Sequence, residues 1–125
     1  MILADTSVWI RHLADRESYR QDLHRLLQAG QVAGHEFVHG ELLIGISTGR
    51  GREPLLSWFA RIPWVRTVAH DRVEEMVAAR SLAGRGLSWI DAHLLAAALV
   101  AGCRIWTADA ALAEAAKSLG VGWRP

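Results

Sequence analysis

The apolar residues of this chain fall into two alternating patterns. Apolar runs short enough for buried strands lie at residues 2–4, 32–33, 64–65, 104–106 and 121–123. Longer stretches with helical spacing lie over about 6–14, 17–29, 35–47, 54–61, 71–83, 88–100 and 109–119. Short strands connected by helices form parallel sheets. The pattern therefore predicts an α/β fold, with a central parallel sheet of about four or five short strands and helices on both faces.

Capping residues help to place the ends of these predicted helices. Pro54 suits the first turn of a helix, where its missing N–H costs nothing. Asp71 with Glu74, and Ser88 with Asp91, have the spacing of reciprocal capping pairs. We therefore expect a helix to begin at each of these three places.

Length and composition narrow the class of protein without naming a function. The chain has 125 residues, of which 51% are apolar, so we expect one domain, residues 1–125, with a substantial core. Its single cysteine excludes an intrachain disulfide and fits a reducing compartment. The longest apolar run, residues 94–101, is too short to span a membrane. We expect a soluble, cytoplasmic protein.

Four acidic residues stand where a parallel sheet would place a site. Asp5 directly follows the first predicted strand, and Asp109 closely follows the strand at 104–106. Glu41 lies on the helix after the second strand, and Asp91 lies in the first turn of its helix. Sites in parallel α/β sheets lie at the C-terminal ends of the strands. We therefore expect the four carboxylates to converge on one pocket.

A cluster of this kind has a clear chemical use and also a purely structural interpretation. Neighbouring carboxylates repel one another unless a cation is present, and Mg²⁺ or Mn²⁺ prefers oxygen ligands. Such an ion binds a phosphodiester, lowers the pKa of a water molecule and stabilises the leaving oxygen. Taken singly, however, Asp5, Asp91 and Asp109 can be helix caps and Glu41 a solvated side chain. The pattern alone leaves both interpretations open.

Each acid also lies within a longer motif. The motifs are Ile-Leu-Ala-Asp-Thr-Ser-Val-Trp-Ile at 2–10, a Glu-Leu with a following glycine within 38–45, Gly-Leu-Ser-Trp-Ile-Asp-Ala-His and the residues after it at 86–97, and Ile-Trp-Thr-Ala-Asp at 105–109. In order and spacing they resemble the motifs of PIN-domain ribonucleases, especially VapC-type toxins of toxin–antitoxin pairs. One difference is Leu112, where many relatives have an aromatic residue.

The resemblance implies a PIN fold and a metal-dependent ribonuclease that hydrolyses RNA with a metal-activated water, using Mg²⁺ or Mn²⁺. It implies a homodimer neutralised by a cognate antitoxin. It carries over Asp5, Glu41, Asp91 and Asp109 as catalytic metal ligands, direct or through water. Hydroxyl groups that can orient them belong to Thr6, Ser7 and Thr107. The alternative is a catalytically inactive PIN-fold module that binds RNA or a protein partner.

A rival motif is His-Glu-x-x-His, formed by His35, Glu36 and His39. On a helix, two histidines at this spacing bind zinc in metalloproteases, with the glutamate as base. Leu42 stands where the extended form of the motif has glycine, and His35 follows a strand directly, so the motif straddles a helix start. The zinc protease is therefore the weaker hypothesis.

A binding surface for RNA is harder to find, because the formal net charge is only +1. Candidates for a basic rim around an acidic pocket are the arginines expected in the first helix or in loops, namely Arg11, Arg50, Arg52 and Arg85. Nothing in the sequence predicts which bases are recognised.

Overall fold

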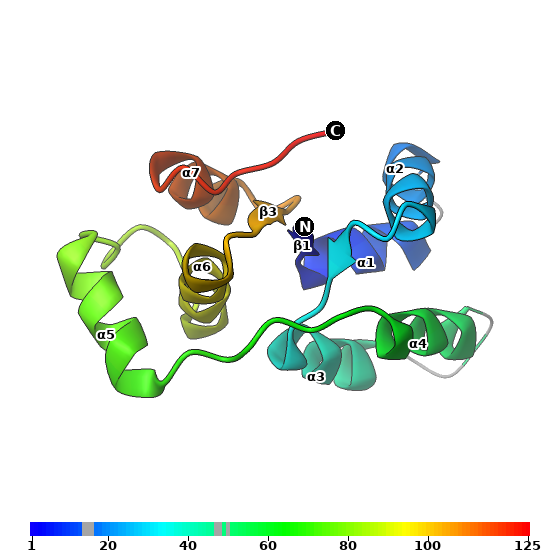
Figure 1. Cartoon of the computed structure of the whole chain (residues 1–125), viewed down its shortest axis with the longest axis horizontal. Coiled ribbons are helices and arrows are strands. Elements are labelled where there is room, and N and C mark those ends of the chain that lie inside the picture. The colour runs from blue at the N-terminus through cyan, green and yellow to red at the C-terminus, as the bar shows by residue number, and fades with distance from the viewer. Residues whose placement is uncertain (14–16, 47–48, 50) are drawn as a thin grey trace.

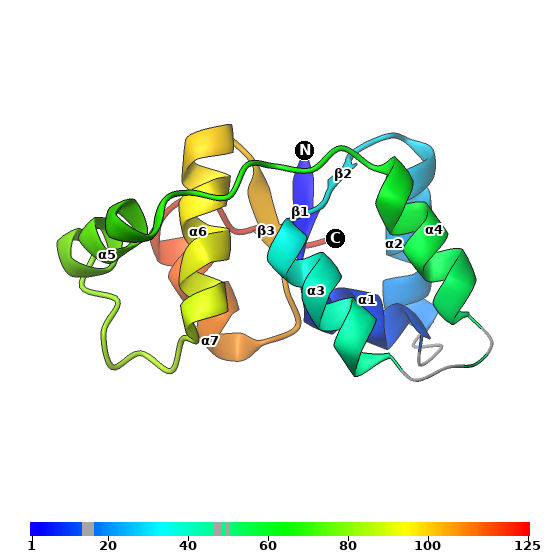
Figure 2. The same ribbon diagram turned by 90° about the horizontal axis from the view of Figure 1, so that it is seen from below.

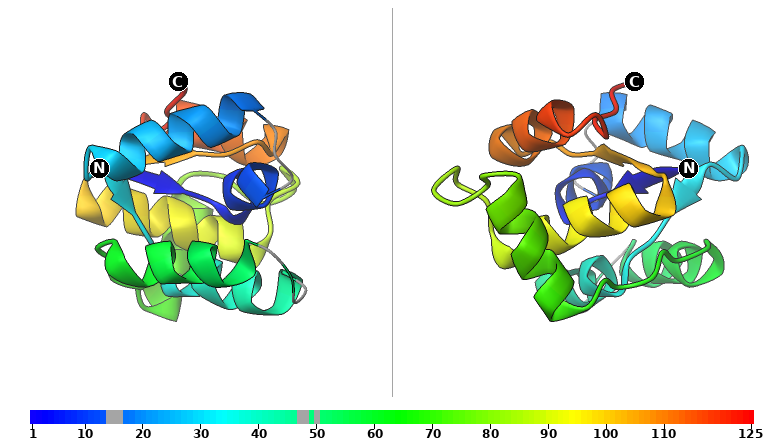
Figure 3. Two further views of the ribbon diagram at one scale, coloured as in Figure 1. Left: turned by 90° about the vertical axis from the view of Figure 1, so that its right-hand side faces the viewer. Right: turned by 60° about the vertical axis from the view of Figure 1, so that its left-hand side comes forward.

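The computed structural model describes residues 1–13, 17–46, 49 and 51–125. Helices cover both faces of a small parallel sheet (Figure 1), as the sequence pattern predicts. The elements in chain order are β1 Ile2–Ala4, α1 Thr6–Leu13, α2 Glu17–Gln28, β2 Val32–Ala33, α3 Glu36–Gly45, α4 Arg52–Arg61, α5 His70–Ala79, α6 Trp89–Ala101, β3 Arg104–Trp106 and α7 Ala110–Ser118. Helices α2 and α7 lie on one face, and α3, α4 and α6 lie on the other (Figures 1 and 3).

The sheet has the order β2-β1-β3, with both pairs parallel. Leu3 of β1 lies opposite Ala33 on one side and Ile105 on the other. The segments predicted as outer strands, 64–65 and 121–123, contribute one parallel bridge each, to Gly34 and to Ile105. The sheet therefore has three paired strands, and each outer segment adds a single bridge.

The core forms where β1 is covered by helices on both faces. All three residues of β1 are buried, and so is an unbroken run of α6 over 92–98. Trp9 of α1 is fully buried, and its indole N–H donates to the carbonyl oxygen of Ala4 at 3.2 Å. This bond satisfies the polar end of a large aromatic side chain inside the core and fixes α1 against the end of β1.

Two of the predicted helix starts need correction. The pair formed by Ser88 and Asp91 is a complete capping box, as expected. At α5 the helix begins at His70, so its N-cap is Ala69, which has no polar side chain, and Asp71 lies inside the first turn. The Glu74 carboxylate bonds His70 Nε2 at 2.8 Å. Helix α4 begins at Arg52 rather than Pro54, within the segment predicted as a loop.

None of the helices in the described part of the chain is long and apolar enough to cross a membrane.

Gly34 is the point where the chain leaves β2 beneath two aromatic rings. A Cβ atom added at Gly34 would lie 2.9 Å from Cδ1 of Trp64 and 3.0 Å from two ring carbons of Phe59. We expect Gly34→Ala to lower the free energy of unfolding by roughly 1–3 kcal/mol, because a buried site is overpacked. Urea denaturation followed by circular dichroism measures this.

The matched control is Gly40→Ala, in the interior of α3, where an added Cβ meets nothing within 4 Å. This variant should gain about 0.5–1 kcal/mol from the lower conformational entropy of its unfolded chain. Equal stability of the two alanine variants would contradict the packing of Gly34 described here.

Candidate active site

The ends of β1 and β3 and the starts of α1, α6 and α7 all lie along one edge of the molecule (Figure 2). Asp5 stands at this edge, directly after β1, and its backbone N–H donates to the carbonyl oxygen of Trp106 at 3.0 Å. This bond continues the pairing of β1 with β3 one residue beyond the strand. It therefore places the Asp5 side chain beside the segment that leaves β3.

The Asp5 carboxylate is buried, with only 6% of the residue exposed, and it accepts several hydrogen bonds. Its Oδ1 accepts from the Ser7 hydroxyl, from the Ser7 N–H at 3.0 Å and from the Val8 N–H at 3.4 Å. Its Oδ2 accepts from the Thr107 hydroxyl at 2.6 Å. Asp5 is thus both the cap of α1 and the bond between α1 and the segment after β3.

Burial dominates the electrostatics of Asp5. Desolvation raises the pKa of its carboxyl, and the hydrogen bonds from Ser7, Thr107 and Val8 oppose that rise. In the described parts of the chain no arginine, lysine or histidine nitrogen lies within 4.0 Å of the Asp5 carboxylate. A buried anion supported by hydrogen bonds alone is the kind of group that a cation stabilises strongly.

Thr107 connects Asp5 with Asp109. The Thr107 hydroxyl donates to Asp5 and accepts from the Asp109 N–H at 3.0 Å. The Ser7 hydroxyl accepts from the Ala108 N–H at 2.9 Å and lies 3.4 Å from the Thr107 hydroxyl oxygen. Asp109 caps α7 through its Oδ2, which accepts from the Leu112 N–H at 2.9 Å. The start of α7 is therefore joined to the start of α1 by hydroxyl groups.

Glu41 is held beside this network by Thr6. Its Oε1 accepts a hydrogen bond from the Thr6 hydroxyl at 2.6 Å, across 35 positions of sequence. Glu41 is half-buried on α3, which packs against α1. Thr6 and Ser7 thus hold two different carboxylates from adjacent positions in the first turn of α1.

Asp91 occupies the same edge of the molecule but is separate from this network. Its Oδ2 accepts from the Ser88 N–H at 3.0 Å, and its own N–H donates to the Ser88 hydroxyl at the same distance. None of the described hydrogen bonds joins Asp91 to the other three acids. The structure therefore joins Asp5 to the Asp109 backbone through the Ser7 and Thr107 hydroxyls, holds Glu41 on the neighbouring Thr6, and leaves Asp91 in its cap.

The expected convergence is incomplete in this arrangement of side chains. Within residues 1–13, 17–46, 49 and 51–125, no three acidic, histidine or cysteine side chains are gathered closely enough to hold an ion. Each carboxylate instead follows its local hydrogen bonds.

The donor chemistry nevertheless fits a divalent cation. Glu41, Asp91 and Asp109 each use one carboxylate oxygen in a hydrogen bond within the described structure. The other oxygen makes no hydrogen bond there, and it is Oε2 in Glu41 and Oδ1 in both aspartates. At Asp91 and Asp109, capping a helix and binding an ion therefore do not compete for the same atom, whereas both oxygens of Asp5 already accept hydrogen bonds. All the groups at this edge are oxygen donors, the type preferred by hard cations.

The four arginines predicted as a basic rim have different surroundings. Arg11 lies over the ring of Tyr19, with its guanidinium carbon 5.5 Å from the ring centroid. Arg52 donates to two carbonyl oxygens at the C-terminal end of α3, and Arg85 donates to the hydroxyl of a residue in α7 at 3.4 Å. Arg50 lies outside the described residues.

The histidines of the rival zinc motif do not share one surface. His35 precedes α3 as its N-cap, where its Nδ1 accepts from the Phe37 N–H at 3.0 Å, and burial lowers its pKa. His39 packs against other rings, 4.9 Å from the Trp64 centroid and 5.6 Å from that of Phe59. One ring therefore caps a helix and the other packs in an aromatic cluster, so the geometry gives the zinc protease no support.

Comparison with known proteins identifies the family. A model of the PIN domain matches residues 2–118. The chain belongs to the PIN-domain family. Over 122 residues it is 40% identical to the protein named ribonuclease VapC32 in two strains of Mycobacterium tuberculosis, CDC 1551 and H37Rv, covering 97% of this chain and 94% of the relative. This degree of identity over nearly the whole length makes it a VapC-type member of that family.

A solved structure shows the same fold at much lower sequence identity. PAE2754 from Pyrobaculum aerophilum superimposes with a TM-score of 0.63 and 16% identity, over 94% of this chain and 90% of the other. The parallel sheet with helices on both faces is therefore the PIN fold predicted from the motifs. At the edge of this sheet, Ser7 and Thr107, two of the hydroxyl residues predicted to orient a carboxylate, both donate to Asp5.

The Thr107 hydroxyl lowers the pKa of Asp5 by hydrogen bonding to its charged form. We expect Thr107→Val to raise the pKa of the Asp5 carboxyl further above its ordinary value, because burial remains and a donor is lost. Carbon-detected NMR of the Asp5 carboxyl across a pH series measures this. Thr67→Val, which removes a hydroxyl bonded to Glu36 instead, is the matched control. An unchanged Asp5 pKa in the Thr107 variant would contradict the network.

Proposed function

We propose that this PIN-domain chain is a metal-dependent ribonuclease that hydrolyses RNA phosphodiester bonds, and that it acts as the toxin of a toxin–antitoxin pair. The observation that carries the proposal is the buried Asp5, held at the end of β1 and joined through Thr107 to the start of α7. The name of its relative, ribonuclease VapC32, supports the same activity. Residues 1–125 act as a single PIN domain in this proposal.

The residues that would hold the ion are Asp5, Glu41, Asp91 and Asp109, directly or through water, and the ion would be Mg²⁺ or Mn²⁺. When bound, such an ion supplies positive charge for the phosphodiester and lowers the pKa of a water molecule. Ser7 and Thr107 hold the Asp5 carboxylate in one orientation, and Thr6 does the same for Glu41. The chain's own part is therefore to position carboxylates before the substrate arrives.

We also propose a homodimer that a cognate antitoxin neutralises in the cytoplasm. Support comes from α3, where Ile44 is 91% exposed beside the exposed Leu43, since adjacent exposed apolar residues favour a protein partner. Helix α4 offers less apolar surface to a partner. Its apolar side chains Leu55 and Phe59 are buried, and those of Leu56 and Trp58 pack against the core.

The first prediction from this function concerns Asp5. We expect Asp5→Asn to lower the rate of RNA cleavage by at least about 100-fold, because the amide carries no charge to bind a cation. A fluorescence-quenched RNA substrate measures the rate, and circular dichroism checks the fold. Asp71→Asn, which neutralises an exposed acid at the start of α5, is the control and should cleave like the unmodified protein. Full activity of the Asp5 variant would disprove the proposed site.

The second prediction concerns the divalent cation. Treatment with EDTA should abolish cleavage, and dialysis into Mg²⁺ or Mn²⁺ should restore it, whereas Ca²⁺ should restore it poorly because its larger coordination shell positions the phosphodiester differently. The measurement is the initial rate in each ion with the same RNA. Undiminished cleavage in EDTA would refute metal dependence. Tight binding of RNA without cleavage in either metal would instead support an inactive RNA-binding module.

A further inference from the structure

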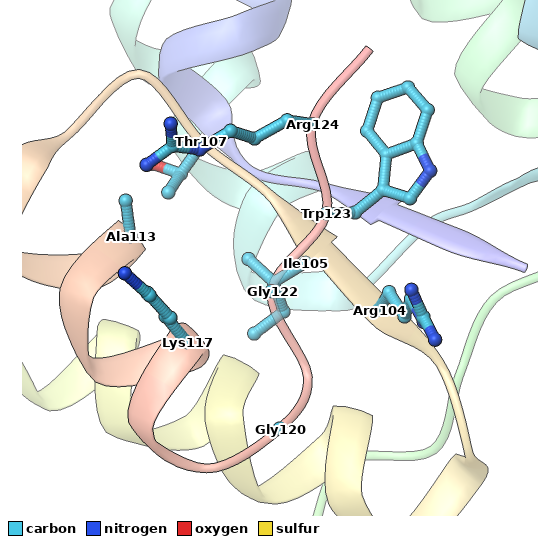
Figure 4. A pocket seen from close by; sticks show the side chains of 9 residues that line it. All are labelled: Arg104, Ile105, Thr107, Ala113, Lys117, Gly120, Gly122, Trp123 and Arg124. Atoms are coloured by element: carbon cyan, nitrogen blue, oxygen red, sulfur yellow. The ribbon is translucent and has the colours of Figure 1, made fainter.

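A cleft lies between β3, α7 and the segment that follows α7. Its volume is about 470 Å³, and residues from all three of these segments line it (Figure 4). Arg104 comes from the start of β3, Lys117 from α7, and Arg124 from the last segment. The cleft is therefore bordered by three cations from three different segments.

These three cations have no acidic partner among the described residues. All three are exposed, and within the described residues no carboxylate lies within 4.0 Å of their side-chain nitrogens. Arg124 reaches toward Thr107 at one end of the cleft in Figure 4. In a chain of formal net charge +1, three unneutralised cations around one cleft form a local positive patch that attracts anions.

At one end the cleft reaches Thr107, the residue that bonds Asp5. A second cavity of about 380 Å³ shares Thr107, Ala113 and Arg124 with the first. Thr107 is also the residue whose hydroxyl donates to Asp5 at 2.6 Å. The positive cleft and the buried carboxylate therefore meet at one side chain. The acid lining the second cavity, Asp22, is already paired with Arg25 at 3.3 Å.

Aromatic rings line both cavities. Trp123 borders the first and is partly exposed. Tyr19 borders the second, stacked on Trp106 with ring centroids 5.8 Å apart and planes inclined by 8°. Cations along a groove together with partly exposed aromatic rings suit a single-stranded nucleic acid, whose phosphates bind the cations and whose bases stack on the rings. An acidic peptide would use the cations but would leave the aromatic surfaces unused.

We propose that this cleft binds single-stranded RNA through Arg104, Lys117 and Arg124, and that it directs the strand past Thr107 toward Asp5. The proposal adds an RNA-binding surface to the proposed ribonuclease function, and the direction given to the RNA strand rests on that function. It places the main phosphate contacts on β3, α7 and the last segment. Of the arginines predicted from the sequence, Arg11 packs on Tyr19 of the second cavity and Arg85 donates to a hydroxyl of α7, whereas Arg52 donates to a carbonyl oxygen at the end of α3.

The test measures RNA binding apart from cleavage. The triple variant R104Q/K117Q/R124Q is made in the Asp5→Asn protein, and its affinity for a fluorescein-labelled 12-nucleotide single-stranded RNA is measured by anisotropy at several salt concentrations. We expect binding at least roughly tenfold weaker, and a salt dependence of log K reduced by about 2, since each lost phosphate contact removes about 0.7. All three positions are exposed, so the fold should survive.

The matched control is R61Q/R66Q/R72Q, which removes the same charge from exposed positions on α4, on α5 and between them, across the sheet from α7 (Figure 1). It should bind RNA like the parent. Equal affinity and salt dependence of the triple variant and the parent would overturn the proposal, and so would an equal loss in the control. The proposal would also be overturned if the triple variant lost binding to poly-glutamate but kept its binding to RNA, because the cleft would then bind an acidic protein.

Failure of the cleft proposal can be distinguished from failure of the proposed ribonuclease function. If the unmodified protein cleaves no RNA in Mg²⁺ or Mn²⁺ while the triple variant still loses RNA affinity, the ribonuclease proposal fails and the binding cleft stands. If the unmodified protein cleaves RNA and the triple variant binds like its parent, the cleft fails and the ribonuclease proposal stands.

Discussion

The parallel pairing of β1 with β3 is the constraint on which the rest of the site depends. Ala4 lies opposite Trp106, and the ladder continues through the Asp5 N–H to the Trp106 carbonyl oxygen. In this register the Asp5 side chain meets Thr107. A slip of one residue would turn alternate side chains to the opposite face of the sheet and separate the two. The buried strand thus fixes a polar contact beyond its own end.

Burying Asp5 is costly, and the surrounding groups show how the cost is offset. Four hydrogen bonds to the carboxylate, from Ser7, Val8 and Thr107, replace water on a group that has no positive neighbour among the described residues. The same bonds tie α1 to the segment after β3. Stability and chemistry are therefore linked at this residue, because any change that loosens the carboxylate also loosens the junction of two elements.

The sequence leaves open whether the acidic residues are helix caps or metal ligands, but one carboxylate can serve both purposes. Asp109 caps α7 with Oδ2, Asp91 caps α6 with Oδ2, and Glu41 bonds Thr6 with Oε1. A carboxylate has two oxygens, and in each of these residues the second makes no hydrogen bond within the described structure. Capping orients the side chain and leaves an oxygen available for an ion.

The local pattern of apolar and capping residues determined the fold class and one helix start of this protein. The alternation of apolar runs and helical periods predicted the parallel α/β fold, and the spacing of Ser88 and Asp91 predicted a capping box that the structure contains. These are short-range signals, carried by residues within one element. The failed capping pair at Asp71 shows their limit, because the helix begins one residue earlier, at His70, and Asp71 then lies inside its first turn.

Only the tertiary structure decided which residues from distant parts of the sequence contact one another. The hydrogen bond from Thr107 to Asp5 spans 102 positions, and that from Thr6 to Glu41 spans 35. The cleft bordered by Arg104, Lys117 and Arg124 exists only because β3, α7 and the last segment fold beside one another. Sequence spacing carries no information about such contacts, because they depend on strand order and helix packing, which are set by the burial of the whole core.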